Sequence, residues 1–421
     1  MRSPRKSPNA DEGPLEVTSS PAQVGQQVYR YYYNGKAALE SMFWSSTLSN
    51  DEEAWVMGHR YCGPHTTTWA REAVSTISYF TYRRAFTQPL SNGATHDAGW
   101  GCMARTGQMM LNYVLRRVFS CAAPIPDRPS KCAATPLVSP RSSPLRQPRD
   151  GSSPASSASP LVQRGDAFTR INLWFADVPE APYGIHQMSD EAARHGLPVG
   201  QWFTPSILCK TLVALIDRHE TVRDRMFVDA ALDQAVYEKR VLHQLVNEGK
   251  SYLLLVPVMF GMTALAKPYD DVVRAFLRMP VCVGIVGGKP NKSLFFVGYQ
   301  GDTIFYLDPH VVQEAFVSPS TIGELSGPRG GTPISSLDPC MVLCFFFNTA
   351  EVFNEWVVAV ENGVNKTAQF PVIVVNFDEP LAGQRSHARH IRTASVAARP
   401  VEASPRDSIA DDCDYIDEED L

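Results

Sequence analysis

The chain has 421 residues, of which 44% are hydrophobic and 20% charged, and its formal net charge is −5. This length and apolar content suffice for one large folded domain or two smaller ones. The mildly acidic balance excludes the basic surface of a typical nucleic-acid-binding protein, so we expect no nucleic-acid partner. Nine cysteines without a Cys-x-x-Cys pair indicate neither a disulfide framework nor a zinc site. We therefore expect no metal, and a reducing, cytoplasmic location.

The first 25 residues are rich in proline, serine and charge without periodicity, which predicts a disordered N-terminal tail. From residue 26 to about residue 380 we expect one folded domain, and no apolar run in it reaches transmembrane length. Within this domain, the apolar spacing from Trp69 to Phe86 predicts a helix that ends before Pro89.

The run Asp-Ala-Gly-Trp-Gly-Cys-Met-Ala-Arg-Thr-Gly-Gln-Met-Met places Cys102 directly before an amphipathic pattern. Apolar residues downstream share one helical face, and Asn112, Arg116 and Arg117 take the other. Cys102 is therefore expected at a helix N-terminus, where the helix dipole favours thiolate over thiol. The alternative interpretation is a small apolar residue of the core.

Residues from about 121 to 165 are dominated by proline, serine, alanine and arginine. Such a composition cannot bury enough apolar surface to fold, so it predicts a disordered insertion within one domain. Four serines precede a proline and are candidate phosphorylation sites, with a plain linker as the alternative. They are Ser139, Ser143, Ser153 and Ser159.

The second half of the chain changes from helical to strand patterns. Amphipathic helices are predicted between Pro205 and Glu248, followed by short apolar runs typical of strands. These runs begin at Tyr252, Val281, Leu294, Thr303, Met341 and Pro371, and Tyr299 to Thr303 is a predicted hairpin. The order favours an α+β domain in which a mostly antiparallel sheet packs on the cysteine-bearing helix. Residues 381–421 end in an acidic run and are predicted to be a disordered tail.

A partner base for the cysteine is found in the run Tyr-Leu-Asp-Pro-His, which ends at His310. In an extended backbone Asp308 and His310 project to the same face, so the carboxylate can orient the imidazole toward a thiol. The alternative is that Asp-Pro ends a strand and His310 caps a turn. His96 is nearer to Cys102 in sequence, but the glycine-containing turn between them gives no reason for contact, and His186 and His195 are expected in a loop at the surface.

Taken together, the motifs resemble those of the autophagins, the cysteine peptidases that process the ubiquitin-like modifier of autophagy. The resemblance rests on the cysteine and Asp-Pro-His motifs and on further runs in the family's order, and it covers about residues 26–378 without the insertion. The further runs are Phe80-Thr-Tyr-Arg-Arg, Tyr183-Gly-Ile-His-Gln, Gly200-Gln-Trp-Phe, Gly287-Gly-Lys-Pro-Asn and Phe353-Asn-Glu-Trp.

The resemblance implies a papain-like fold with a small extra helical subdomain within Phe168 to Glu248, and no cofactor. It makes Cys102 the nucleophile, His310 the general base and acid, and Asp308 the orienter of the histidine. Tyr82 matches the tyrosine that helps to stabilise the oxyanion. Trp202 matches the tryptophan that, with a movable loop, narrows the cleft over the substrate's terminal glycine.

The implied activity is cleavage of the modifier after its C-terminal glycine, both from its precursor and from phosphatidylethanolamine. A monomer that meets the autophagosomal membrane only through lipidated substrate is expected. Two other interpretations stay open: an acyltransferase of the transglutaminase type, and an inactive module that only binds the modifier. The run from Phe370 to Ile373 has the spacing of a docking motif, but as part of a predicted strand it is assigned to the core.

Overall fold

The structure is a computed structural model, and it describes residues 34–35, 48–119, 160–289, 292–324, 329–368 and 370–378. The predicted tails lie outside these ranges, as does most of the predicted insertion. A helix, α4 (Pro160–Leu173), already begins before the predicted end of the insertion. Cys62 is disulfide-bonded, a feature that the cysteine spacing did not indicate.

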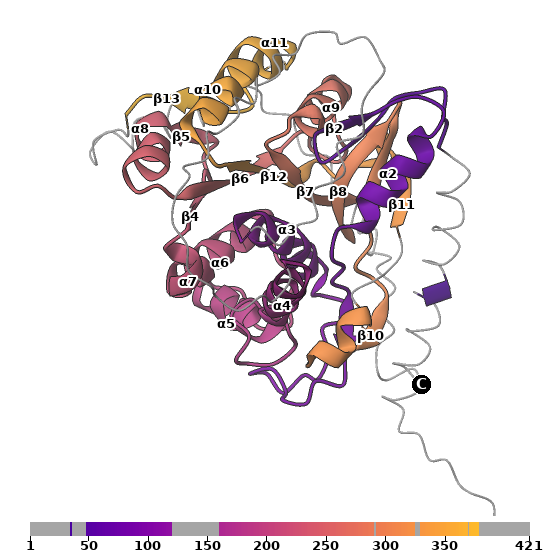
Figure 1. The fold of residues 1–421 in the computed structure, drawn as a ribbon, viewed down its shortest axis with the longest axis vertical. Helices are drawn as coiled ribbons and strands as arrows, with labels where there is room; N and C mark the ends of the chain where they lie inside the picture. The colour runs from indigo at the N-terminus through magenta and orange to yellow at the C-terminus, as the bar shows by residue number, and fades with distance from the viewer. Residues whose placement is uncertain are drawn as a thin grey trace, which may run out of the picture.

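A mixed sheet forms the centre of the molecule (Figure 1). Its strands are β1 (Ala54–Val56), β2 (His59–Tyr61), β4 (Met226–Ala230), β6 (Ser251–Met259), β7 (Cys282–Lys289), β8 (Lys292–Gln300), β9 (Thr303–Leu307), β11 (Arg329–Pro333) and β12 (Cys340–Phe347). Within the described residues their order is β11-β9-β8-β7-β12-β6-β4, and β1 and β2 join through β8. Neighbouring strands are antiparallel except β4 and β6, which are parallel, so the sheet is mixed but mostly antiparallel, as predicted. The predicted hairpin is confirmed, because β8 and β9 pair across Gly301.

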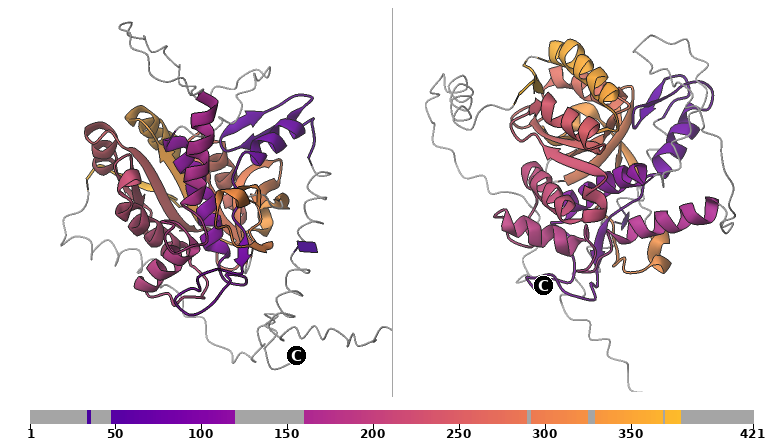
Figure 2. Two further views of the ribbon diagram at one scale, coloured as in Figure 1. Left: turned by 60° about the horizontal axis from the view of Figure 1, so that its bottom comes forward. Right: turned by 60° about the vertical axis from the view of Figure 1, so that its left-hand side comes forward.

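Helices cover both faces of this sheet (Figure 1). The helices besides α4 are α2 (Thr66–Ser75), α3 (Cys102–Val118), α5 (Ile185–Arg194), α6 (Pro205–Arg218), α7 (Glu220–Arg223), α8 (Glu238–Leu242), α9 (Asp270–Arg278), α10 (Ala350–Ala359) and α11 (Asn365–Thr367). One apolar core joins α3 and α6 to the sheet, and a second core joins α9 and α10 to its opposite face. Figure 2 shows the indigo β1–β2 hairpin and α2 projecting from one side, and the magenta α4 as a single long helix. In the described part of the chain, no helix combines the length and apolar character needed to cross a bilayer.

The helix that begins at Cys102 is buried on nearly all sides, although the sequence predicted a polar face. Its polar residues are satisfied inside the protein: Asn112 Nδ2 donates to Asn172 Oδ1 at 2.8 Å, and Arg116 Nη1 donates to the Thr76 carbonyl at 2.7 Å. Because these partners lie on α4 and after α2, α3 is enclosed by helices as well as by the sheet. Hydrogen bonds, and not solvent, occupy the face that looked exposed.

Three sequence predictions about secondary structure need correction. The helix predicted from Trp69 to Phe86 ends at Ser75, and the aromatic run after it is extended and enters β3 (Tyr82–Arg84). The region predicted to be helical up to Glu248 also contains β4 and β5 (Ala235–Tyr237). The last predicted strand is only β13 (Val374–Asn376), which pairs with β5 outside the main sheet. In the first two cases the segment pairs as a strand with a segment distant in sequence, and this pairing outweighs its local helical pattern.

The prediction that the run from Phe370 to Ile373 belongs to the core is correct for Ile373 and wrong for Phe370. Phe370 is 66% exposed and is not a core residue, whereas Ile373 is fully buried. The run therefore presents its aromatic residue but not its aliphatic one.

A short parallel pair of strands brings two distant segments together. β3 pairs with β10 (Val312–Glu314), so that Tyr82 lies opposite Val312. This pairing carries the chain that follows His310 alongside the chain that leads to Cys102.

Candidate active site

Cys102 is the first residue of α3 and is buried. Gly101 precedes it, and a Cβ at that position would come within 2.5 Å of Asp97 Oδ2. Gly99 has a φ of +92°, a conformation that side chains other than glycine rarely adopt. The two glycines therefore let the chain turn closely around Asp97 and place the sulfur at the helix N-terminus.

Asp308 and His310 lie at the end of β9 and are both buried. Asp308 Oδ1 lies 2.5 Å from His310 Nδ1 and 2.9 Å from the His310 backbone nitrogen. One carboxylate oxygen thus holds both the ring and the backbone of the histidine. Since Nδ1 is occupied by Asp308, Nε2 is the ring nitrogen that faces the thiol of Cys102, with which the imidazole interacts.

Tyr82 completes the group from a third segment of the chain. Its ring meets the His310 ring edge-on, with centroids 5.3 Å apart, and it packs with Cys102 and Val312 in one small cluster. Its backbone N–H donates to the Pro309 carbonyl at 2.8 Å. Tyr82, Cys102, Asp308 and His310, which were predicted separately, are therefore neighbours.

The charges of this group support one another. Burial alone would raise the pKa of Cys102, but the hydrogen bond and charge of His310, the Ser293 backbone N–H and the Tyr82 hydroxyl lower it below its ordinary value. Burial would lower the pKa of His310, but Asp308 and Cys102 raise it to about 9. Burial would raise the pKa of Asp308, but its bonds to His310 lower it. The arrangement thus shifts both groups toward their charged forms, the thiolate of Cys102 and the imidazolium of His310.

The indole of Trp202 lies over the turn that leads to Cys102. Its Nε1 donates to the Gly99 carbonyl, and the side chain is 48% exposed. Asn92 Nδ2 donates to the Val199 carbonyl and thereby fastens the loop that carries the tryptophan. Trp202 is thus held at the outer side of the site.

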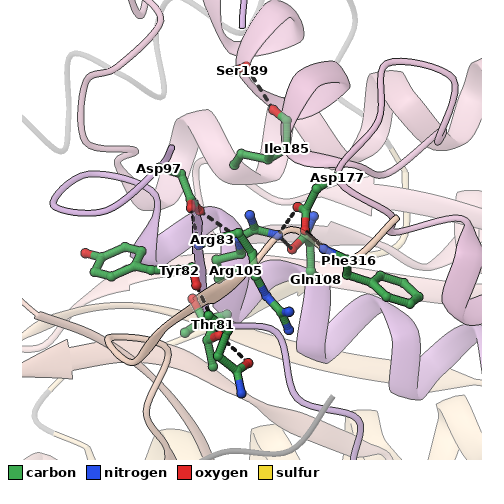
Figure 3. Close-up of polar contacts among 12 residues, drawn as sticks. Thr81, Tyr82, Arg83, Asp97, Arg105, Gln108, Asp177, Ile185, Ser189 and Phe316 are labelled. Carbon is green, nitrogen blue, oxygen red and sulfur yellow. Dashed lines mark hydrogen bonds and ion pairs between the residues drawn. The ribbon is translucent and has the colours of Figure 1, made fainter. Parts of the chain in front are cut away.

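A buried charge network behind the nucleophile was missed by sequence reasoning (Figure 3). Asp97 accepts hydrogen bonds from the Arg83 backbone N–H and from Arg105 Nε, each at 2.6 Å. Arg105 Nη1 lies 2.8 Å from Asp177 Oδ1, and Asp177 in turn accepts from the Phe316 N–H. The network joins β3, the first turn of α3 and three loops, which carry Asp97, Asp177 and Phe316. The signal available in the sequence is the pair of charged residues, Asp97 and Arg105, on either side of the cysteine.

Two further contacts near the group were also missed. Tyr79 bonds through its hydroxyl to the backbone of Asp308. The hydroxyls of Ser293 and Thr106 lie 2.9 Å apart, and Thr106 also donates to the Met103 carbonyl. Because a hydroxyl has one proton, Ser293 is the donor of that pair, which fixes β8 to the helix of the nucleophile.

His186 and His195 contact other residues and not this group. His186 is buried, with Nε2 2.7 Å from the Gln88 carbonyl, so its predicted surface location is wrong. His195 is partly exposed beside Glu191. Within the described ranges, no three histidine, cysteine, aspartate or glutamate side chains gather closely enough to hold a metal ion. The chemistry available to the group is nucleophilic attack by sulfur with proton transfer by an oriented imidazole.

Comparison with known proteins agrees with this chemistry. The model of the peptidase C54 catalytic domain matches residues 68–359. The cysteine protease ATG4D of Xenopus laevis is 30% identical over 338 residues, which are 74% of this chain and 71% of the relative. The cysteine protease ATG4A of Homo sapiens is 27% identical over 351 residues, 75% of this chain and 80% of the relative. The matched region contains every residue of the group described above.

Proposed function

Because the chain belongs to the peptidase C54 family and is a cysteine peptidase of the autophagy pathway, we propose that it cleaves the ubiquitin-like autophagy modifier after its C-terminal glycine. The same cleavage matures the precursor and releases the modifier from phosphatidylethanolamine. The observation that carries this proposal is the position of the Cys102 thiol at a helix N-terminus, facing the imidazole of His310. Asp308 orients this imidazole, with Oδ1 2.5 Å from His310 Nδ1.

In the proposed mechanism the Cys102 thiolate attacks the carbonyl carbon of the terminal glycine. The Cys102 backbone N–H and the Tyr82 hydroxyl stabilise the oxyanion that forms. The His310 imidazolium gives its proton to the leaving amine, the C–N bond breaks, and a thioester remains on Cys102. Water then attacks the thioester as His310 takes its proton, which releases the glycine carboxylate and restores the thiolate–imidazolium pair.

The proposed selectivity for glycine rests on Trp202. An indole fastened to the Gly99 carbonyl lies beside the approach to Cys102. A substrate residue with a Cβ would collide with the walls of a narrow passage there, whereas glycine would pass. Such a passage restricts the residue before the scissile bond and leaves the leaving group free to vary. The leaving group can then be a peptide or an aminophospholipid.

The partner in this proposal is the modifier, as precursor and as lipid conjugate, with membrane contact through the lipidated substrate. A monomeric, cytoplasmic enzyme remains the expectation from the sequence. Family membership favours hydrolysis over the two alternatives weighed from the sequence, acyl transfer to amines and binding without cleavage.

Two substrates test the proposal: a soluble precursor with a C-terminal tag, and modifier conjugated to phosphatidylethanolamine in vesicles. We expect the purified chain to release both tag and lipid, and Cys102→Ala to abolish release. Cys209→Ala is the matched control, since Cys209 is buried and burial raises its pKa to about 12. Cleavage that survives Cys102→Ala, or that stops equally with Cys209→Ala, contradicts the assignment. A glycine thioester that passes to an added amine faster than to water favours acyl transfer.

A further inference from the structure

The hydroxyl of Tyr79 bonds to both backbone polar groups of Asp308. It donates to the Asp308 carbonyl at 2.8 Å and accepts from the Asp308 N–H at 2.5 Å. One proton and the lone pairs of a phenol satisfy both groups at once. Tyr79 is fully buried, so no water can take over these bonds if the hydroxyl is removed.

The phenol keeps its proton across the pH range in which the protein can work. Burial, and then the charge of Asp308, raise the pKa of Tyr79 well above its ordinary value. The Asp308 carbonyl therefore retains its donor. The bond does not depend on the protonation of the cysteine or the histidine.

The chain around Asp308 is held in register by the segment from Tyr79 to Arg84. The Pro309 carbonyl accepts from the Tyr82 N–H, and β10 pairs with β3. These contacts are between backbone groups, whereas Asp308 is held by a side chain. The Asp308 backbone in turn determines where its carboxylate meets His310 Nδ1.

We propose that Tyr79 is a positioning residue, whose hydroxyl holds the Asp308 backbone so that the carboxylate orients the His310 ring toward Cys102. The proposal rests on the function proposed for Cys102 and His310. Tyr79 acts only through Asp308, and a displacement of a catalytic group by about 1 Å is known to cost up to about 100-fold in rate.

Tyr79→Phe deletes the hydroxyl and keeps the ring. We expect kcat to fall about 10- to 100-fold with KM nearly unchanged, because substrate contacts stay intact. We also expect the pH midpoint of Cys102 alkylation by iodoacetamide to rise, because a misplaced imidazolium stabilises the thiolate less. Tyr183→Phe is the matched control: Tyr183 is equally buried, and its hydroxyl bonds His219 Nδ1 at 2.9 Å.

A double substitution separates positioning from a general effect on structure. In an Asp308→Asn background, Tyr79→Phe should lower kcat by less than about twofold, since the orientation that it serves is already lost. Alkylation needs no substrate, so it tests Tyr79 even if the wild-type chain fails to cleave the modifier. A Tyr79→Phe protein whose alkylation midpoint and kcat equal those of Tyr183→Phe overturns the proposal.

If Tyr79→Phe does not fold, 3-fluorotyrosine at position 79 decides the question. It keeps the hydroxyl but weakens the oxygen as an acceptor for the Asp308 N–H. We expect 3-fluorotyrosine at position 79, but not at position 183, to lower kcat severalfold and to raise the pH midpoint of Cys102 alkylation. Equal behaviour of 3-fluorotyrosine at positions 79 and 183 overturns the proposal.

Discussion

Asp97 and Arg105 form a buried ion pair across the start of α3, with Asp97 Oδ2 2.6 Å from Arg105 Nε. The two residues flank Cys102 in the sequence, and a second carboxylate, Asp177, lies 2.8 Å from the same guanidinium. Burial raises the pKa of Asp97 above its ordinary value despite the opposing effect of Arg105. One arginine therefore compensates two buried carboxylates behind the nucleophile.

We expect Arg105→Met to lower the free energy of unfolding by about 3–5 kcal/mol, because it leaves two buried carboxylates without their cation. Lys239→Gln is the control, since Lys239 and its partner Asp378 are largely exposed and such surface pairs contribute less than about 1 kcal/mol. Urea denaturation monitored by fluorescence measures both. Equal stabilities of the two variants would contradict a structural role of the network.

The chain contains a natural control for the Asp-Pro-His motif. Leu307 and Leu337 each begin a Leu-Asp-Pro run, and in both runs the aspartate accepts from the backbone N–H two residues later. Only the first run also bonds to a histidine ring, through Asp308. A run that leads into the strand β12 and a run that orients a base share this backbone bond.

We accordingly expect Asp308→Asn to reduce kcat by about 10⁴-fold, the size of the loss that the same substitution causes in a serine-protease triad, because His310 keeps its place but takes the wrong tautomer. Asp338→Asn should leave kcat within about twofold, since Asp338 contacts the backbone N–H and the thiol of Cys340 and no histidine ring. Single-turnover cleavage of the modifier precursor compares them. A comparable loss in both variants would mean that the shared backbone bond of the Leu-Asp-Pro run, and not the ring contact, matters.

Trp202→Ala should weaken the selection for glycine. Removal of the indole widens the approach beside Gly99, so a precursor with alanine in place of the terminal glycine should be cleaved better relative to the natural one, by about 10-fold in kcat/KM. Phe370→Ala removes another exposed aromatic residue and should leave the ratio unchanged. An unaltered glycine-to-alanine ratio in Trp202→Ala would show that other residues form the passage.

The parts of the site that could be predicted from the sequence are those whose chemistry is local. A cysteine after two glycines and before an apolar periodicity indicates a helix N-terminus, and Asp308 lies two residues from His310 in the same extended run. The helix at Cys102 and the β8–β9 hairpin follow from such local patterns.

The parts that could not be predicted depend on contacts distant in sequence. Asn112 looks like a solvent-facing residue until Asn172 is placed against it. Tyr79 looks like one aromatic residue of a helix until β3 pairs with β10 and draws that segment into extended form beside Asp308. No spacing within either segment specifies its partner.

The pH dependence of cleavage follows from two opposite pKa shifts in the active site. The pKa of Cys102 is lowered, chiefly because His310 outweighs the effect of burial, so the thiolate persists as pH falls below the ordinary thiol range. The pKa of His310 is raised to about 9, so the imidazolium that protonates the leaving amine persists as pH rises to that value and is lost above it. We expect kcat/KM to form a bell, with its alkaline limb near pH 9.

The same pair predicts which cysteine reacts first. At neutral pH iodoacetamide should label Cys102 faster than Cys340, which is more accessible but whose pKa is raised by burial and by Asp338. His310→Ala should abolish this difference, because it removes the cation that stabilises the thiolate. Peptide mass spectrometry after short labelling times measures each rate. Two outcomes would contradict an ion pair in the resting site: Cys340 reacting as fast as Cys102 in the wild-type chain, or kcat/KM still rising above pH 9. In either case the thiolate would have to form only when substrate is bound.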